Sequence, residues 1–365
     1  VIDSQAGTIS VIDDGSYTVS YTSGKLTSSG NTVTAEEGGV FTLESGTVES
    51  TGDVAIRAGV NDTTTGTVNI EGGYVVAQEM CTMAAKDSTL NVSGGVLEAK
   101  DNAVLAGNGT AGRGGYTINV TGGTLIGRIT SSGYVSCGIY HPNDGTVKVS
   151  GGTIVSTNGA GIVARAGTTN ITGGTIIALG DSATEGKVGD SRVVVTTSGV
   201  VLDLEAGYPG AGIENGKATN AQVNISGDPD ISGNASAVSV LATPTVTEDD
   251  NVIITGGTFN TDVSEYCAPG LIAESDGDGA FSITTDSNMT VQVQSADGAV
   301  KGAYASLTDA VANAASDDIL VLLADQIPTA EIAIESGKEL TLDLAGHLII
   351  PNKASIIVKG GLTVK

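Results

Sequence analysis

The stretch Val68-Asn69-Ile70-Glu71-Gly72-Gly73-Tyr74-Val75 decides the fold, because close copies of it recur along the chain. In each copy apolar residues alternate with polar ones, which is the period of a half-buried strand, and a glycine pair then supplies a turn that needs positive φ. A second short strand follows the glycines at once. The further copies occupy residues 90–97, 118–125, 147–154, 169–176 and 252–259, with a degenerate copy at 223–228.

Most successive copies begin about 22 to 30 residues apart. This interval is too short for a strand, a helix and a return, but it suits one coil of three short strands. The third strand of a coil is predicted at residues 54–59, 103–107 and 161–167, each of which ends in a small or turn-forming residue. The spacing therefore predicts a parallel β-solenoid.

Stacked coils place equivalent residues in ladders about 4.8 Å apart. One apolar ladder is expected to point inward, and it consists of Val68, Leu90, Ile118 and Val147. A ladder of side-chain amides is expected on the outside, where its members can bond to one another along the stack. This outward ladder consists of Asn69, Asn91, Asn119, Asn170 and Asn224.

Composition and charge agree with a thin solenoid and exclude some partners. The chain has 365 residues, yet aromatic residues make up only 3% and tryptophan is absent, so a large centre-packed core is not expected. Its 41 acidic and 16 basic residues give a formal net charge of −25, which repels nucleic acid and anionic membrane surfaces. No apolar run approaches the length of a membrane span. We therefore expect neither nucleic acid binding nor membrane insertion.

The repeat divides the chain into four parts. Residues 1–50 are expected to form irregular first coils, and residues 51–260 form the regular β-helix coils. Longer excursions from these coils are expected at residues 107–115, 180–191 and 205–220, projecting from one face where binding would be built.

The last two parts lie beyond the regular coils. Residues 261–303 are assigned to a terminal coil and a strand connection, and residues 304–365 to a capping helix and the start of a second β-helix. The helix is expected from about Ser306 to Ala315, with a capping-box-like opening and one apolar face that covers an open solenoid end. Strand signals then resume at residues 319–323, 339–344, 355–358 and 361–364. Because the chain opens at Val1 and its last strand stops in mid-coil, we expect it to be a piece of a longer protein.

Two signatures carry a resemblance to a known family. One is the recurrent Ser/Thr-Gly-Gly-Thr-apolar phrase, including residues 255–259 with residues 262–266 after it, and the other is residues 320–325 followed by residues 340–347. These stretches resemble the right-handed, pectin-lyase-like parallel β-helix repeats of large surface proteins from gut-type Gram-positive bacteria. The resemblance implies an all-β fold, a right-handed single-stranded parallel β-helix, at an extracellular, cell-surface location. It is specific for fold and not for function, because this fold serves enzymes, adhesins and phage spikes.

Catalytic chemistry has few candidates. A polysaccharide lyase or hydrolase needs paired carboxylates, or a base beside a cation, across a groove. Arg57 and Arg165 are expected at equivalent places in their coils, with Lys86 in a similar position, but as solvated side chains. The acids Glu49, Glu71, Glu79 and Glu98 lie nearby in sequence without forming a recognisable pair. No catalytic residue is therefore assigned, and whether the chain is an enzyme is left open, with a non-catalytic role favoured.

The two histidines and three cysteines are interpreted structurally. His141 is expected in a turn and more exposed, and His347 at a strand end that bonds the neighbouring coil. Cys81 and Cys137 are expected to be small buried side chains, and no pair of cysteines has the spacing of a zinc or redox motif.

One loop is a weak metal candidate, and outward rows suggest a ligand surface. Asp276 and Asp278 alternate with glycines and could supply some calcium oxygens, although the EF-hand pattern fails after them. No other cofactor is expected. Stacked outward rows of Thr, Asn and Tyr suit sugars, with Tyr74, Tyr116 and Tyr134 able to stack on sugar rings, although no patch is singled out.

These features leave three functions open. The first is a non-catalytic structural or adhesive segment that binds glycans or host surface ligands. The second is a polysaccharide lyase or hydrolase, and the third is a phage or prophage spike or fibre, or a filament subunit that associates head to tail through its open strand ends.

Overall fold

The computed structural model describes residues 2–4, 9–12, 15–20, 24–110, 112–128, 136–180, 184–188, 191–204, 213–214, 217–218, 221–241 and 251–365. Contacts divide the chain into two units. Unit 1 is Val1–Val252 with Thr258–Thr261, and unit 2 is Ile253–Gly257 with Asp262–Lys365.

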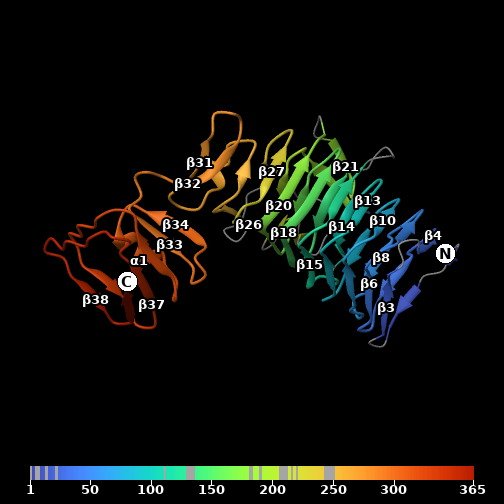
Figure 1. Cartoon of the computed structure of the whole chain (residues 1–365), viewed down its shortest axis with the longest axis horizontal. Helices are drawn as coiled ribbons and strands as arrows, with labels where there is room; N and C mark the ends of the chain where they lie inside the picture. Colours follow the sequence, from blue (N-terminus) through green and yellow to red (C-terminus); the bar gives the residue numbers. More distant parts are fainter. Residues whose placement is uncertain are drawn as a thin grey trace. The chain divides into compact units, whose positions relative to one another are not determined.

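Unit 1 is a stack of parallel strands in which each strand of a coil pairs with its equivalent in the next coil (Figure 1). The first ladder contains β1 (Ile2–Ser4), β4 (Lys25–Ser28), β7 (Thr47–Ser50), β10 (Tyr74–Ala77), β13 (Val96–Ala99), β16 (Thr124–Gly127), β27 (Asp230–Gly233) and β30 (Thr258–Phe259). The second contains β3 (Ser16–Val19), β6 (Val40–Leu43), β9 (Thr67–Ile70), β12 (Thr89–Val92), β15 (Tyr116–Val120), β26 (Gln222–Ile225) and β29 (Asn251–Ile254). The third contains β2 (Ile9–Val11), β5 (Val33–Ala35), β8 (Ile56–Ala58), β11 (Thr82–Ala84), β14 (Ala103–Gly107), β17 (Cys137–His141), β19 (Ile162–Ala164), β23 (Val200–Asp203) and β28 (Val238–Leu241).

Two long strands join the first and second ladders. β18 (Gly145–Ser156) and β20 (Thr168–Ala178) run through the glycine pair, so each belongs to both ladders. Two antiparallel hairpins interrupt the later coils, one made by β21 (Thr184–Val188) and β22 (Ser191–Val195), the other by β24 (Ile213–Glu214) and β25 (Lys217–Ala218). The long parallel ladders are consistent with a parallel β-helix.

The inward apolar row is confirmed. Val68, Leu90, Ile118 and Val147 are paired rung to rung, and each side chain is at most 1% exposed. Alternation accounts for this burial, because successive side chains of a strand point to opposite faces of its sheet. The neighbouring residue of each rung is therefore free to be polar.

The glycine pair is required twice over, as Gly122 and Gly123 show. Gly123 has φ +81°, in the left-handed region that side chains disfavour. At Gly122 an added Cβ would lie 2.3 Å from the backbone oxygen of Ser93 in the preceding coil. The first glycine therefore permits coils to approach, and the second permits the turn.

Some strands of the third ladder are buried on both faces, unlike the half-buried strands of the other two ladders. β14 and β19 are buried at every residue. The row that runs through Ser10, Thr34 and Arg57 becomes apolar in later coils. There it joins a buried cluster through Ala106, Tyr140, Val163 and Val201. Unbroken apolar runs such as Ala-Val-Leu-Ala, which lack alternation, are the sequence signal of burial on both sides.

Unit 2 contains the 3₁₀ turn η1 (Ser264–Tyr266), a hairpin, and a second set of parallel strands. The hairpin is β31 (Leu271–Ser275) with β32 (Phe281–Thr285), and the other antiparallel pair is β33 (Val291–Gln294) with β34 (Val300–Tyr304). The parallel pairs are formed by β35 (Ile319–Leu322), β37 (Glu339–Asp343) and β39 (Gly361–Val364), and by β36 (Ile332–Ile334) with β38 (Ile356–Val358).

The predicted helix is present as α1 (Leu307–Asn313). The Ser306 hydroxyl caps it by accepting a hydrogen bond from the Asp309 backbone amide. Its apolar face is buried in the core of unit 2, together with residues of β33, β35, β36 and β37. In unit 2 the helix thus covers one side of the strands that follow it.

The inward assignment can be tested at Val120, which is fully buried between Val92 and Val149 of the adjacent coils. We expect Val120→Asp to lower the free energy of unfolding by more than about 3 kcal/mol, because it buries an unpaired charge between two coils. The control is Thr117→Asp, on the outward side of the same strand. Equal unfolding midpoints for the two variants, measured by circular dichroism, would contradict the assignment.

Candidate binding groove

The outward side of the second ladder carries the predicted row of amides. The amide nitrogen of Asn91 donates to the oxygen of Asn69 at 2.9 Å, and Asn119 donates to Asn91 at 2.8 Å. In a later coil Asn224 donates to Asn170 at 3.0 Å. The predicted amide ladder is thus confirmed in two segments.

Lys148 lies between these two segments. Its rung is paired with Asn119 on one side and with Asn170 on the other. Sequence reasoning missed this residue, although its signal was visible in the copy Val147-Lys148-Val149, which has lysine where the copies on either side of it have asparagine. An exposed ammonium therefore interrupts a row of amides.

A groove of about 530 Å³ follows this row across four coils. Its lining is made by Asn91, Val92, Asn119, Thr121, Lys148, Ser150, Asn170 and Thr172. The lining offers amides, hydroxyls, the aliphatic parts of side chains and one cation. The lining contains no carboxylate, histidine or cysteine, so it lacks the carboxylate pair that the common mechanisms of glycan hydrolysis need.

The predicted basic row does not exist. Arg57 is paired with Met83 and, through the intervening rungs, with Val163, so Arg165 lies two residues beyond the equivalent position. Lys86 is displaced as well, and it pairs with the adjacent Asp87 at 2.9 Å. The expectation of equivalent places was wrong because coil lengths differ, and only strand pairing shows the register.

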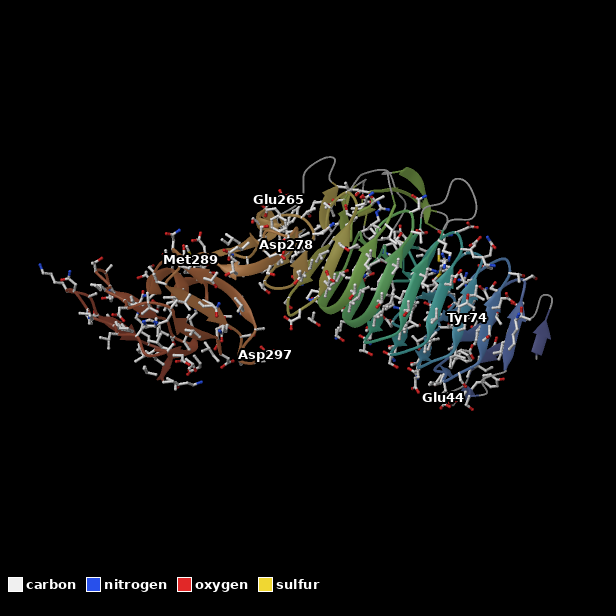
Figure 2. All side chains as sticks on the ribbon, turned by 45° about the horizontal axis from the view of Figure 1, so that its top comes forward. Glu44, Tyr74, Glu265, Asp278, Met289 and Asp297 are labelled. Atoms are coloured by element: carbon white, nitrogen blue, oxygen red, sulfur yellow. The ribbon has the colours of Figure 1, made fainter. Side chains whose placement is uncertain are left out.

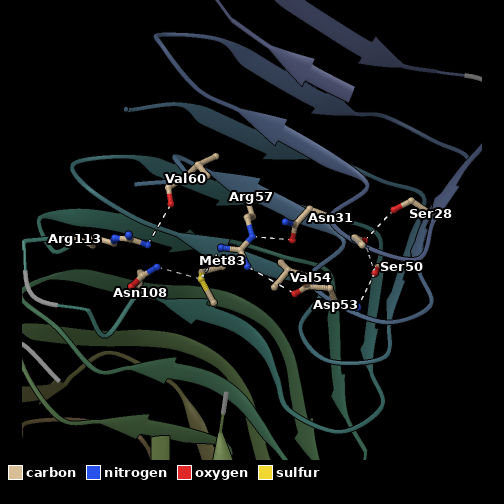
Figure 3. Close-up of polar contacts among 11 residues, drawn as sticks. Ser28, Asn31, Ser50, Asp53, Val54, Arg57, Val60, Met83, Asn108 and Arg113 are labelled. Atoms are coloured by element: carbon tan, nitrogen blue, oxygen red, sulfur yellow. Dashed lines mark hydrogen bonds and ion pairs between the residues drawn. The ribbon is translucent and has the colours of Figure 1, made fainter. Parts of the chain in front are cut away.

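Arg57 belongs to a network of side chains on the third ladder (Figure 3). Its Nε donates to Asn31 at 2.8 Å, and its guanidinium lies 3.7 Å from Asp53. Burial lowers the pKa of Arg57, although Asp53 opposes the shift. Arg57 is therefore anchored rather than freely solvated.

Arg165 is fully buried, which corrects the expectation of a solvated side chain. It is 1% exposed, and its Nε lies 3.4 Å from a carboxylate oxygen of Asp203, which is itself 0% exposed. Asp203 is the last residue of β23, which pairs with β19, and Arg165 directly follows β19, so the two charges meet at the ends of neighbouring strands. The two buried charges neutralise each other, and neither side chain lines the groove.

His141 is also buried rather than exposed in a turn. It ends β17, is 0% exposed, and its Nδ1 lies 3.0 Å from the Thr169 hydroxyl. Tyr116 packs edge-on against its ring and is equally buried, so Tyr116 cannot stack on a sugar. Burial lowers the pKa of His141 to about 3, which keeps the ring neutral.

The other aromatic and acidic candidates lie elsewhere. Tyr74 lies on β10 of the first ladder (Figure 2). Its hydroxyl donates to Glu98 at 3.3 Å, whereas Tyr134 lies outside the described residues. Glu49 pairs with Lys25 at 2.7 Å, which lowers its pKa, and Glu98 pairs with Arg128 at 2.8 Å. The remaining acids Glu71 and Glu79 do not line the groove.

The calcium candidates lie in the turn between β31 and β32, where Figure 2 labels Asp278. Asp276 Oδ1 accepts hydrogen bonds from the backbone amides of Asp278 and Ala280, at 2.8 and 3.0 Å. These bonds lower the pKa of Asp276 and close the hairpin turn. Within the described residues, no group of three or more His, Cys, Asp or Glu side chains is placed to hold a metal ion.

The remaining predictions concern His347 and the cysteines. His347 Nδ1 lies 3.5 Å from Asp325, one strand repeat earlier in unit 2. Cys81 and Cys137 are free and fully buried, as predicted, and burial raises the pKa of both thiols.

No protein-family model, curated protein or solved structure matches the chain. Among the described residues, no helix combines the length and the apolar character needed to cross a bilayer. The argument for function therefore depends on the fold and the groove.

The buried ion pair can be tested by a two-step substitution. We expect Arg165→Met to lower the free energy of unfolding by about 3–5 kcal/mol, because Asp203 is left buried and charged. Adding Asp203→Leu should restore most of this loss, because no buried charge remains. Urea unfolding measures both, and a double variant less stable than the single one would contradict the pairing.

The buried neutral histidine predicts a dependence on pH. An unfolded histidine titrates near pH 6.5, whereas His141 in the folded chain stays neutral down to about pH 3. Between these values the unfolded state binds one more proton, so stability falls as the pH falls, by up to about 1.4 kcal/mol per pH unit from this residue. His141→Gln should lack this component when urea unfolding is followed from about pH 7 to about pH 4.5. Parallel stability curves for the two proteins would show that His141 is not buried neutral.

Proposed function

We propose that the chain is a non-catalytic, extracellular segment of a bacterial surface protein, in which a right-handed, pectin-lyase-like parallel β-helix carries a sugar-binding face. The observation that carries the proposal is the groove over the second ladder. Its amides and hydroxyls both donate and accept hydrogen bonds, which is what sugar hydroxyls require. The structural part of the role follows from the stack, because coils that contact only their neighbours form a scaffold that can be extended by adding coils.

The form of the groove also suits a chain-like ligand. Its polar groups recur at the coil spacing of about 4.8 Å, and rows of identical groups can bind successive units of a polymer in the same way. Threonine methyl groups and aliphatic stems between the polar atoms offer contacts for the apolar faces of sugar rings. A small compact ligand would use only one part of this length.

The groove gives no support to glycan cleavage. Hydrolysis by the common two-carboxylate mechanisms needs acids about 5 to 10 Å apart across the scissile bond, and the groove lining contains none. Of the acids that sequence analysis considered, Glu49 pairs with Lys25 and Glu98 pairs with Arg128, and none of the four lines the groove. Binding without turnover is therefore the function that this geometry supports best.

A glycan array followed by direct binding measurements tests the proposal. Ser150 lies in the middle of the groove and is exposed, so Ser150→Leu should weaken binding to a retained glycan at least tenfold by filling the space. The matched control is Ser282→Leu on an exposed position of β32, which should leave binding unchanged. Equal binding by both variants, or release of reducing or unsaturated ends from the glycan, would contradict the proposal.

A further inference from the structure

The hydrogen bonds of the amide ladder all run in one direction. Each asparagine donates through Nδ2 to the coil before it, from Asn119 to Asn91, from Asn91 to Asn69, and from Asn69 to the hydroxyl of Thr42. Asn224 likewise donates to Asn170. Each segment of the ladder therefore has an acceptor at its C-terminal end and a donor at its N-terminal end.

At Lys148 these two ends face each other. Asn119 Oδ1 is the acceptor end of the first segment, Asn170 Nδ2 is the donor end of the second, and Lys148 occupies the rung between them. Among the residues that the structure describes, none forms a hydrogen bond with these two amide atoms, and none pairs with the Lys148 ammonium. Successive rungs are about 4.8 Å apart, so the three groups span about 10 Å of the groove floor.

The charge around this break is unusual for the chain. The protein has 41 acidic residues and a net charge of −25, yet the eight residues that line the groove include one lysine and no acid. A solvated lysine on such a surface would commonly have a carboxylate partner, as Lys25 has in Glu49. Lys148 instead offers its charge to the groove.

We infer that the break in the amide ladder at Lys148 is a subsite for a sugar that carries a carboxylate. The carboxylate would accept hydrogen bonds from the Lys148 ammonium and from Asn170 Nδ2, and a neighbouring hydroxyl of the same sugar would donate to Asn119 Oδ1. This inference rests on the proposed glycan-binding function and adds the class of sugar.

The arrangement distinguishes this ligand class from two simpler ones. A small anion without hydroxyl groups has no proton to donate, so it would leave the Asn119 acceptor without a partner. A neutral sugar would satisfy the amides and could accept a hydrogen bond from Lys148 through a hydroxyl, but it has no negative charge to form an ion pair with the ammonium. Of these three ligand classes, the sugar with a carboxylate is the one that forms an ion pair with Lys148 and also satisfies both amide atoms.

The variant Lys148→Asn provides a sharp test, because it removes the charge and completes the amide row. The matched control is Lys353→Asn, an exposed lysine in unit 2 with φ +61°, a conformation that asparagine tolerates. Both variants change the net charge equally. The probes are a hyaluronan tetrasaccharide and its carboxyl-reduced counterpart, which differ only in the carboxylates, with binding measured by calorimetry at about 0.15 M salt.

We expect the unmodified chain and Lys353→Asn to bind the carboxylated probe at least tenfold more tightly than the reduced one. Lys148→Asn should bind both probes alike while keeping the unfolding midpoint of the unmodified chain. A preference that survives in Lys148→Asn would overturn the inference and leave the proposed glycan binding in place. So would equal binding by the unmodified chain of the carboxylated and carboxylate-free members of both this probe pair and the pair described next. Failure of the unmodified chain to bind any glycan of the array would overturn both.

A second pair of probes distinguishes the source of the carboxylate. Sialyllactose and lactose present the acid on a terminal sugar, whereas the tetrasaccharide presents it within a chain. Preference for the carboxylated member of either pair, lost in Lys148→Asn, supports the subsite and tells whether the acidic sugar is terminal or internal.

Discussion

The contact between one coil and the next is the interaction on which the rest of the structure depends. Backbone hydrogen bonds join each strand to its equivalent one coil away, and inward side chains such as Ile118 are buried between their counterparts above and below. Because each coil contacts only its neighbours, stability accumulates coil by coil. The same contact aligns the outward residues of successive coils, so surface groups of one kind form rows that run along the stack.

This constraint explains both the amide ladder and its interruption. A row of identical amides can satisfy itself, because each side chain donates to one neighbour and accepts from the other. Replacing a single member, as Lys148 does, leaves one acceptor and one donor at the break. Replacing one amide in such a row therefore alters the hydrogen bonding of its own rung and of the two rungs beside it. A single residue can in this way create a binding subsite.

Buried polar groups occur where coils differ in length. The Asn143 amide donates to the backbone oxygens of Asn108 and Thr110, in the longer connection after β14. It thus satisfies carbonyls that lie outside the strand ladders, and buried backbone groups need such partners. His141 and Tyr116 lie beside it, and Arg165 with Asp203 fills the end of a neighbouring pair of strands. The interior is therefore apolar where strands stack, and it contains polar groups at strand ends and connections.

The sequence by itself determined the strands, the glycine turns, the inward row and the amide ladder, as well as the capped helix that begins at Leu307. These features arise from local periodicity, since alternation, positive φ and capping involve residues close together in the chain. Only the tertiary structure decided that Arg165 and His141 are buried, and that Arg57 and Arg165 occupy different rungs. The reason is that coils of unequal length shift the register, and burial of an outward residue depends on distant parts of the chain rather than on its own strand.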